Sequence, residues 1–328
     1  MFRALKLIRS HEWWAYKLPP LLAVGYATAL SSSAVPLYKA AEWLIGVLLS
    51  VIIGAIYVSV INDITDIEED RASGKANRMA GIPAGRRWII PCVCVLLGLA
   101  AIRFLYTDGL SACLYILPWL SFSLYSFPPV RLKNRGALGV AADAAGSHLF
   151  ITLLMVSTVS RFVGVEIDWI WFAAVGVWSF AYGIRGILWH QFMDRENDRK
   201  VRLRTYATEK DPEAFRTVPV FILLIELLAL AVMLFRIDIP YTLLFLVLYL
   251  FLVFIRYKRR GYAVVIVLVP AGRPFQILMG DYYHLFLPLS LLVYAAFVQP
   301  WAWAVGVVHI LLFPGKIRWA VKDLLGIH

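Results

Sequence analysis

Long apolar stretches recur along almost the whole chain. Most are close to the roughly 20 residues that a helix needs to cross about 30 Å of hydrocarbon, whereas the strands of a membrane barrel would read as short alternating segments. The pattern therefore predicts spanning helices over about 19–38, 42–62, 87–106, 110–127, 137–158, 168–190, 217–235, 239–256 and 262–279.

Further apolar sequence runs to about residue 313, but prolines such as Pro288 and Pro300 interrupt it. Because proline breaks helices, this region is compatible with one span, two spans or a re-entrant segment. We expect an all-α, polytopic transmembrane helical bundle of about nine or ten spans. The charged segments between spans are too short to bury a core of their own, so residues 1–328 are expected to form a single integral-membrane domain.

Composition agrees with a membrane protein and charge indicates its orientation. The chain is 61% hydrophobic and 16% charged, against about 45–50% and 25% in soluble domains. A net charge of +11 would be compatible with nucleic-acid binding. The basic residues lie in short loops, however, so orientation in the membrane explains them better. Alternate loops are rich in Lys and Arg, and the positive-inside rule predicts that these loops are cytoplasmic. The membrane is expected to be the plasma membrane of a prokaryote. Arg3, Lys6, Arg9 and Lys17 place the N-terminus on the same side. Lys316, Arg318 and Lys322 favour a cytoplasmic C-terminus, which requires an even number of spans, whereas nine spans would put the C-terminus outside.

An acidic segment, NDITDIEED, follows the second predicted span. On a helix, Asp63, Asp66 and Asp70 would share one face, with Asn62 beside it. Clustered carboxylates repel one another unless cations neutralise them, and Mg²⁺ is usually bound by a few carboxylates together with substrate phosphates. We expect a metal site here, and we assign the two glutamates of the segment to a solvated helix end.

A second acidic pair, Asp194 and Asp198, ends the sixth predicted span. One such pair is a weak signal, but two clusters at corresponding ends of two spans form a facing pair of metal-binding groups. Diphosphate also needs cationic donors on its remaining oxygens. The nearby candidates are Arg71, Lys75, Arg78, Arg195 and Arg199.

The fourth predicted span ends in the sequence YSFPPVRLK, a Pro-Pro turn that brings Arg131 and Lys133 to the same face. Topology alone would place basic residues here, so a diphosphate clamp and simple anchoring are about equally supported. Polar residues also occur within the spans, where they usually face a cavity or a partner. Asp143 is expected either to receive a proton or hold an acceptor hydroxyl, or to pair structurally with Arg185.

Together, these three segments resemble the UbiA superfamily of intramembrane prenyltransferases, whose marks are NDxxDxxxD, a YSxPPxxxK-like turn and DxxxD after the second, fourth and sixth spans. The resemblance covers roughly residues 15 to 260, and the matching residues are Asn62, Asp63, Asp66, Asp70, Tyr125, Ser126, Pro128, Pro129, Lys133, Asp194 and Asp198. It implies a bundle around a central cavity open to lipid, in which Mg²⁺ holds a polyprenyl diphosphate and an acceptor attacks its first carbon.

The chain departs from the family pattern at several positions. Met79 stands where many members have proline, Arg202 where many have glycine, and His190 and Gln191 before the last motif are not general to the family. These changes leave the donor end intact. With the basic stretch RKVRLR they favour a polar, phosphorylated or sugar-like acceptor.

The expected enzyme is a prenyltransferase that transfers an alkyl group other than methyl. Its predicted metal ligands are Asp63, Asp66, Asp70, Asp194 and Asp198, and its catalytic residues are Asp66, Asp194 and Asp143. Asn62 and Tyr125 are expected to bind substrate with the basic residues named above. The alternatives are a terpene cyclase, in which the donor's own double bond attacks, and a divalent-cation transporter, which would favour carboxylates near the bilayer midplane.

Overall fold

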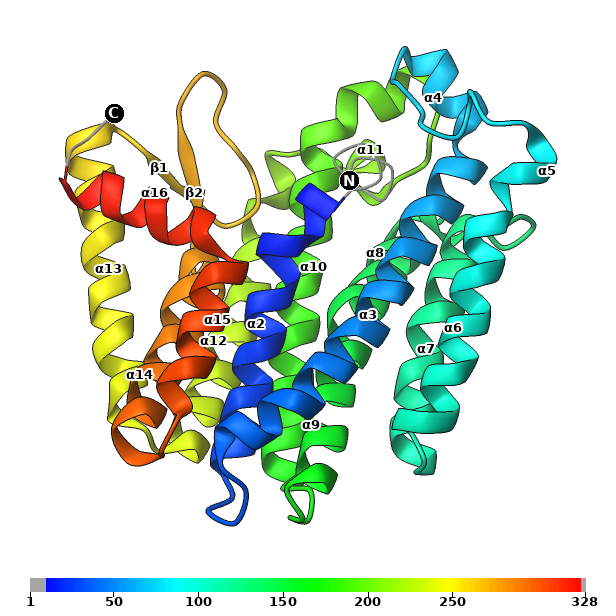
Figure 1. Cartoon of the computed structure of the whole chain (residues 1–328). Helices are drawn as coiled ribbons and strands as arrows, with labels where there is room; N and C mark the ends of the chain where they lie inside the picture. The colour runs from blue at the N-terminus through cyan, green and yellow to red at the C-terminus, as the bar shows by residue number, and fades with distance from the viewer. Residues whose placement is uncertain (1–9, 326–328) are drawn as a thin grey trace. The chain divides into compact units, whose positions relative to one another are not determined.

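The computed structural model describes residues 10–325 and consists almost entirely of helices (Figure 1). The contacts divide the chain into two compact units. Unit 1 contains Gly46–Leu154 and Ser179–Leu224, and unit 2 contains Glu12–Ile45, Met155–Trp178 and the chain from Ile225 onward. Helices α3 and α10 contribute residues to both units, and the single domain stays a prediction.

Unit 1 holds all three sequence motifs. Its elements are most of α3 (Leu37–Thr65), α4 (Ile67–Ser73), α5 (Ala84–Arg87), α6 (Ile89–Leu105), α7 (Gly109–Ser126), η1 (Leu132–Asn134), α8 (Ala137–Ala144), η2 (Ala145–Leu149), the start of α9 (Phe150–Phe162), the second part of α10 (Trp169–Lys200), α11 (Tyr206–Glu209), η3 (Ala214–Arg216) and the start of α12 (Thr217–Ile237).

Unit 2 holds the remaining parts of α3, α9, α10 and α12 and the C-terminal elements. The elements that belong to it alone among the described residues are α13 (Pro240–Arg260), β1 (Ala263–Val265), β2 (Phe275–Ile277), η4 (Tyr282–Phe286), α14 (Leu287–Val298), α15 (Ala302–Leu312) and α16 (Pro314–Leu325). Helix α2 (Ser10–Leu30) overlaps the predicted first span, about 19–38, over residues 19–30, and its side chains are described from Trp13 onward.

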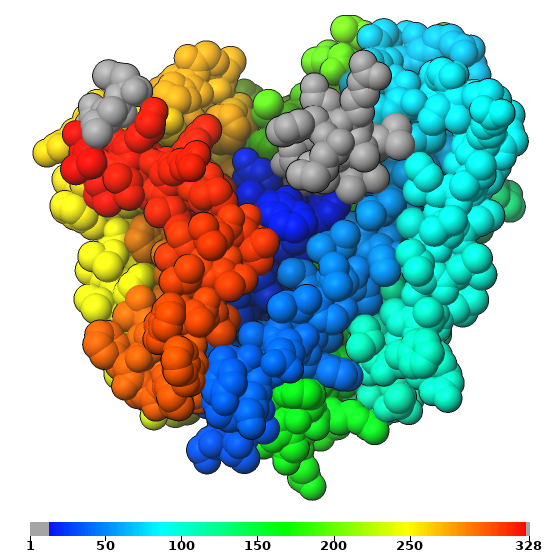
Figure 2. All heavy atoms as spheres, in the orientation of Figure 1, coloured from blue at the N-terminus to red at the C-terminus, as the bar shows by residue number. Residues whose placement is uncertain are grey.

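The helices have the length and the surface of membrane spans. Within the described residues, seven are long and apolar enough to cross a bilayer, or eight if the bent pair α15 and α16 counts as one span. Helix α6 exposes a row of large apolar side chains, with Leu96 67% and Phe104 74% exposed, on the part of the surface drawn in cyan in Figure 2. Such a surface suits lipid, and the predicted all-α bundle is confirmed.

The predicted span over 262–279 is wrong. Helix α13 ends at Gly261, whose φ of 65° closes the helix in the left-handed conformation, and the following residues form strands β1 and β2, paired in parallel from Ala263 with Phe275 to Val265 with Ile277. Between them, Pro270, Gly272 and Pro274 interrupt the apolar run. Because proline and glycine disfavour a helix interior and the β-branched VVIV sequence favours strands, the apolar run does not continue as a helix.

A buried ion-pair network fastens α16 within unit 2. The Arg256 guanidinium binds Asp281 at 2.6 Å and Asp323 at 2.7 Å, and the Lys316 ammonium binds Asp281 at 2.8 Å. Burial by itself would raise the pKa of the Asp281 carboxyl, but the charges of Lys316 and Arg256 outweigh it and hold that pKa well below its usual value. These ion pairs hold α16 at the 83° bend that separates it from α15.

Close backbone packing positions the turn after α7. A Cβ built on Gly139 of α8 would lie 2.6 Å from the carbonyl oxygen of Leu132 and 3.1 Å from the Cα of Lys133. Both are backbone atoms and cannot move aside as a flexible side chain would. Glycine at residue 139 therefore lets α8 press directly against η1, which carries Lys133.

We predict that Gly139→Ala lowers the free energy of unfolding by about 1–3 kcal/mol, the usual effect of overpacking, and displaces η1. Gly186→Ala on α10 is the matched control, because no atom lies within 4 Å of its added Cβ and alanine is the better helix former. Thermal unfolding of the detergent-solubilised variants measures the difference, and equal stability of the two variants would contradict the packing argument.

Candidate active site

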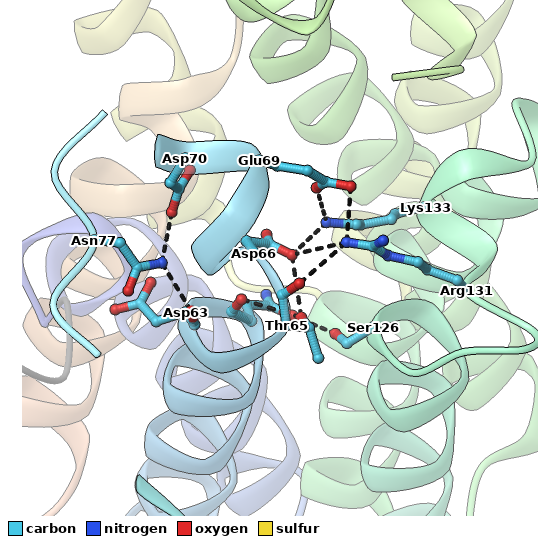
Figure 3. Close-up of polar contacts among 10 residues, drawn as sticks. Asp63, Thr65, Asp66, Glu69, Asp70, Asn77, Ser126, Arg131 and Lys133 are labelled. Carbon is cyan, nitrogen blue, oxygen red and sulfur yellow. Dashed lines mark hydrogen bonds and ion pairs between the residues drawn. The ribbon is translucent and has the colours of Figure 1, made fainter. Parts of the chain in front are cut away.

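The acidic motif lies at an interruption between two helices. Helix α3 ends at Thr65 and α4 begins at Ile67, so Asp66 stands between them with φ −103° and ψ 4°. The backbone bonds from Asp66 N to Asn62 O at 3.0 Å and from Asp70 N to Asp66 O at 2.8 Å keep a near-helical course. The motif divides into two groups that face different partners (Figure 3).

The first group joins the acidic motif to the turn after α7. The Lys133 ammonium contacts Asp66 and binds Glu69 at 2.9 Å, and the Arg131 guanidinium binds Glu69 at 2.9 Å and Asp66 at 3.5 Å (Figure 3). The Lys133 side chain is only 7% exposed, so these carboxylates are the partners that compensate its buried positive charge. Arg131 reaches them from a left-handed backbone conformation with φ 38°.

The second group is organised by Asn77. Its amide nitrogen donates to the backbone oxygen of Asp63 at 2.8 Å and to the Asp70 carboxylate at 2.7 Å (Figure 3). Its amide oxygen accepts from the backbone nitrogen of Met79 at 2.9 Å. The Asp63 carboxylate, which is 6% exposed, pairs with Arg78 at 3.3 Å. The loop after α4 thus folds back over the motif.

The third motif meets the same loop. The Lys75 ammonium binds the Asp194 carboxylate at 3.0 Å, and His190 Nδ1 lies 3.8 Å from it. Asp198 accepts a hydrogen bond from the Thr205 hydroxyl at 3.3 Å. Lys75, from the loop that follows the first acidic motif, therefore contacts the third motif within unit 1. That the two acidic motifs form one metal-binding pair stays a prediction.

Tyr125 and Asn62 lie beside these carboxylates. Asn62 contacts the Ser126 hydroxyl at the end of α7, so the first and second motifs touch directly. Tyr125 is within electrostatic range of Asp143, Asp66 and Asp198.

Other predicted site residues make contacts away from the carboxylates of the motifs. Arg71 pairs with the exposed Glu68 at 3.3 Å, and Arg199 pairs with Glu196 at 3.4 Å. Arg195 donates to the backbone oxygens of residues 207 and 210, each at 2.8 Å. Arg71 and Arg199 therefore pair with solvent-exposed glutamates, and Arg195 binds the backbone of the segment that follows α10.

Asp143 of α8 accepts a hydrogen bond from the Ser147 hydroxyl at 3.4 Å. Arg185 of α10 is buried, with its guanidinium 5.8 Å from the centre of the Tyr182 ring. Both the proton-accepting role of Asp143 and its alternative pairing with Arg185 stay predictions.

Two departures from the family pattern have structural explanations. Met79 is fully buried and packs with Val60 and Ile67, so an apolar side chain fastens the loop where proline is common. Arg202 has φ 57°, the left-handed conformation that glycine adopts without strain. The backbone course is therefore one that suits glycine although the residue is arginine.

Two residues near the site were missed by the sequence analysis. Glu69 is 24% exposed and pairs with both cations of the turn, whereas it was assigned to a solvated helix end. Its position three residues after Asp66 was the available signal, since such residues are neighbours on a helix. Asn77 had no comparable signal, because a loop asparagine reaches its partners through tertiary folding.

The donor chemistry of the site suits a hard cation. Among the described residues, no three His, Cys, Asp or Glu side chains are gathered as a ready-made metal site. The acidic motifs instead offer carboxylate oxygens paired with amines and guanidinium groups. This fits Mg²⁺, which takes oxygen ligands and is commonly held by one or two carboxylates plus substrate phosphates rather than by a protein cage.

Comparisons with known proteins agree with this arrangement. A family model described as the UbiA prenyltransferase family matches residues 18–263. A solved UbiA homologue from Archaeoglobus fulgidus has a TM-score of 0.60 at 18% identity, covering 90% of this chain and 98% of that one. Another structure, described as a UbiA homologue from that organism bound to DMAPP and Mg²⁺, has a TM-score of 0.55 at 15% identity with the same coverage.

A structure described as a UbiA homologue from the same organism bound to GPP and Mg²⁺ has a TM-score of 0.54 at 16% identity and again covers 90% of this chain and 98% of that one. No curated protein matches. The family match covers most of the chain, and several described helices can cross a bilayer. The chain is an integral membrane protein that belongs to the UbiA prenyltransferase family.

Proposed function

We propose that this protein is a Mg²⁺-dependent prenyltransferase that moves a polyprenyl chain from its diphosphate to an acceptor. The observation that carries the proposal is the convergence in unit 1 of the α3–α4 carboxylates, the cations of the turn after α7 and the Lys75–Asp194 ion pair. The solved relatives described as bound to DMAPP or GPP with Mg²⁺ support a prenyl diphosphate as the donor class.

The carboxylates would hold Mg²⁺ between the two acidic motifs. The proposed ligands are Asp63, Asp66, Asp70, Asp194 and Asp198, with Asp66 and Asp194 as the residues on which catalysis depends most. When bound, Mg²⁺ supplies positive charge that stabilises a departing diphosphate. Asn62 and Tyr125 would contact the bound donor next to these metal ligands.

The cations of the site would bind the rest of the diphosphate. In the free protein, Lys75, Arg78, Arg131 and Lys133 are paired with carboxylates, and this pairing holds them near the place where the donor's charge would arrive. With Mg²⁺ held by the carboxylates, these four cations would be available to bind the phosphate oxygens of the donor. Because the leaving group grows more anionic as the allylic bond breaks, such donors favour the transition state over the ground state.

The acceptor would then attack the allylic carbon, and the proton of the acceptor would pass to Asp143.

We further propose that the site opens on the cytoplasmic face, because the loops that build it are the Lys- and Arg-rich loops that the positive-inside rule places there. The membrane would be the plasma membrane of a prokaryote. The positive charges of Arg71, Arg195 and Arg199 would act on the diphosphate at longer range, because these side chains bind groups other than the proposed metal ligands.

The first prediction concerns metal and carboxylates. Purified protein in nanodiscs, given labelled polyprenyl diphosphates and a cell extract, is expected to release diphosphate with Mg²⁺ and to stop when Mg²⁺ is chelated. Asp66→Ala and Asp194→Ala should each lower the rate by at least about a hundredfold, the effect of removing a group that stabilises transition-state charge. Glu196→Ala is the control, because its side chain is 76% exposed on the same helix as Asp194.

The product decides between the reactions. Label joined to an acceptor supports transfer, whereas cyclic hydrocarbon formed from donor alone would identify a terpene cyclase. No turnover of any donor, in folded protein that still binds Mg²⁺, would contradict the proposal and favour cation transport.

The second prediction separates two neighbouring glutamates. Glu69→Gln should raise the concentration of donor needed for half-maximal rate several-fold and lower stability by about 1 kcal/mol, because it removes a partly buried partner of Arg131 and Lys133. Glu68→Gln should change neither, since Glu68 is exposed and pairs only with exposed Arg71 among the described residues. Equal effects of the two substitutions would show that the pairing of Glu69 has no role in holding the cations.

A further inference from the structure

Gln191 of α10 is a buried polar side chain that the described structure leaves unsatisfied. It is 4% exposed, and neither its amide nitrogen nor its amide oxygen has a hydrogen-bond partner among the described residues. Lipid offers such a side chain no hydrogen bonds. Buried amides in proteins are nearly always paired, so an unpaired one needs a physical reason.

The position of Gln191 connects it to the proposed donor site. It precedes Asp194 by three residues and Asp198 by seven in one continuous helix, so the three side chains share one face of α10. A glutamine within a membrane helix commonly bonds to a neighbouring helix, but the described residues provide no such bond. The free amide thus lies about one helical turn deeper than the carboxylate that Lys75 binds.

We propose that Gln191 binds a hydroxyl group of the acceptor and so selects a hydroxyl-bearing acceptor whose oxygen becomes prenylated. This inference rests on the proposed prenyl transfer. A primary amide has two N–H donors and one carbonyl acceptor, and a hydroxyl both donates and accepts. Two adjacent acceptor hydroxyls would satisfy both ends of the Gln191 amide: the reacting one accepts from the amide N–H, and its neighbour donates to the carbonyl oxygen.

The bond changes of the step balance. The allylic carbon–oxygen bond of the donor breaks and its electron pair leaves with the diphosphate. A lone pair of the acceptor oxygen forms the new carbon–oxygen bond, and the hydroxyl proton passes to the Asp143 carboxylate. Gln191 neither gains nor loses a proton: its amide N–H donates to one lone pair of the reacting oxygen, which leaves the O–H of that hydroxyl directed to Asp143, and its carbonyl oxygen accepts from an adjacent hydroxyl. It is a binding residue that sets specificity.

Gln276 offers a matched comparison within the same chain. It is also buried, at 8% exposed, but its amide is paired at both ends. Its oxygen accepts from the Arg256 guanidinium at 3.3 Å, and its nitrogen donates to the backbone oxygen of Val253 at 3.2 Å. Replacing each glutamine with methionine, which has a similar shape without hydrogen-bonding groups, compares an unpaired amide with a paired one.

The first experiment measures thermal unfolding of the purified, unliganded variants. Gln191→Met is expected to raise the melting temperature by about 2 °C, because it removes an unsatisfied buried amide. Gln276→Met is expected to lower the melting temperature, because it leaves the partners of a paired amide unmatched. A fall for Gln191→Met as large as that for Gln276→Met would show that its amide is already satisfied in the free protein and would overturn the inference.

The second experiment uses labelled geranyl diphosphate, Mg²⁺ and a protein-free cell extract as the acceptor source. The labelled product, separated from donor, is expected to release its label in mild acid, as an allylic carbon–oxygen bond does. In Gln191→Met the amount of extract needed for half-maximal transfer should rise about tenfold, the loss expected for one hydrogen bond. The corresponding concentration of geranyl diphosphate should change less than twofold.

The outcomes separate this inference from the proposed function. Acid-stable label in a carbon–carbon bond, or equal use of the extract by the wild type and Gln191→Met, would overturn the role of Gln191 and leave prenyl transfer standing. Absence of Mg²⁺-dependent diphosphate release from the wild type would overturn the proposed function and this inference together.

Discussion

Charge compensation among the carboxylates of the acidic motifs is the constraint on which the organisation of unit 1 depends. Like charges this close would separate or take up protons unless cations met them. Lys133 is the central cation, since its side chain is 7% exposed and contacts both Asp66 and Glu69. Removing either side of such a buried pair leaves an uncompensated charge, so the acidic motif and the turn after α7 stabilise each other's positions.

The backbone around this ion pair is arranged to bring its partners together. Gly139 allows α8 to touch the backbone of η1, and Arg131 adopts the left-handed conformation that directs its side chain to Glu69. On the other side, Asn77 ties the loop after α4 to Asp70. The charged groups are thus held by packing and by backbone hydrogen bonds, which is the preorganisation that electrostatic catalysis requires.

The Lys75–Asp194 ion pair of unit 1 is more exposed than the Arg256–Asp323 ion pair of unit 2. Arg256 and Asp323 have side chains 6% and 8% exposed and bind at 2.7 Å, so they act as a fixed internal connection for α16. Lys75 and Asp194 in unit 1 are 40% and 33% exposed. An incoming anion or cation reaches such a half-exposed pair at lower cost, because part of its hydration is retained. The same residue types therefore suit a structural role in one unit and ligand exchange in the other.

The sequence by itself determined the membrane helices and the chemistry of the acidic motifs. Apolar length is a local property that a bilayer converts directly into helices, and Asp63, Asp66 and Asp194 stand out because carboxylates at span ends are rare without a cation. The prediction of a spanning helix over 262–279 was wrong. The segment is apolar, but its proline, glycine and β-branched residues favour two short strands instead.

Only the tertiary structure decided which charges meet. The pairing of Lys75 with Asp194 and of Glu69 with the turn joins residues 119 and 64 positions apart, and sequence spacing carries no information about such distances. It also separated Lys133 from Arg195, both of which the sequence predicts as phosphate ligands, because the Lys133 side chain contacts carboxylates and the Arg195 side chain donates to backbone carbonyls. The unpaired amide of Gln191 is visible only in three dimensions, because satisfaction of a polar group depends on every neighbour that packing brings to it.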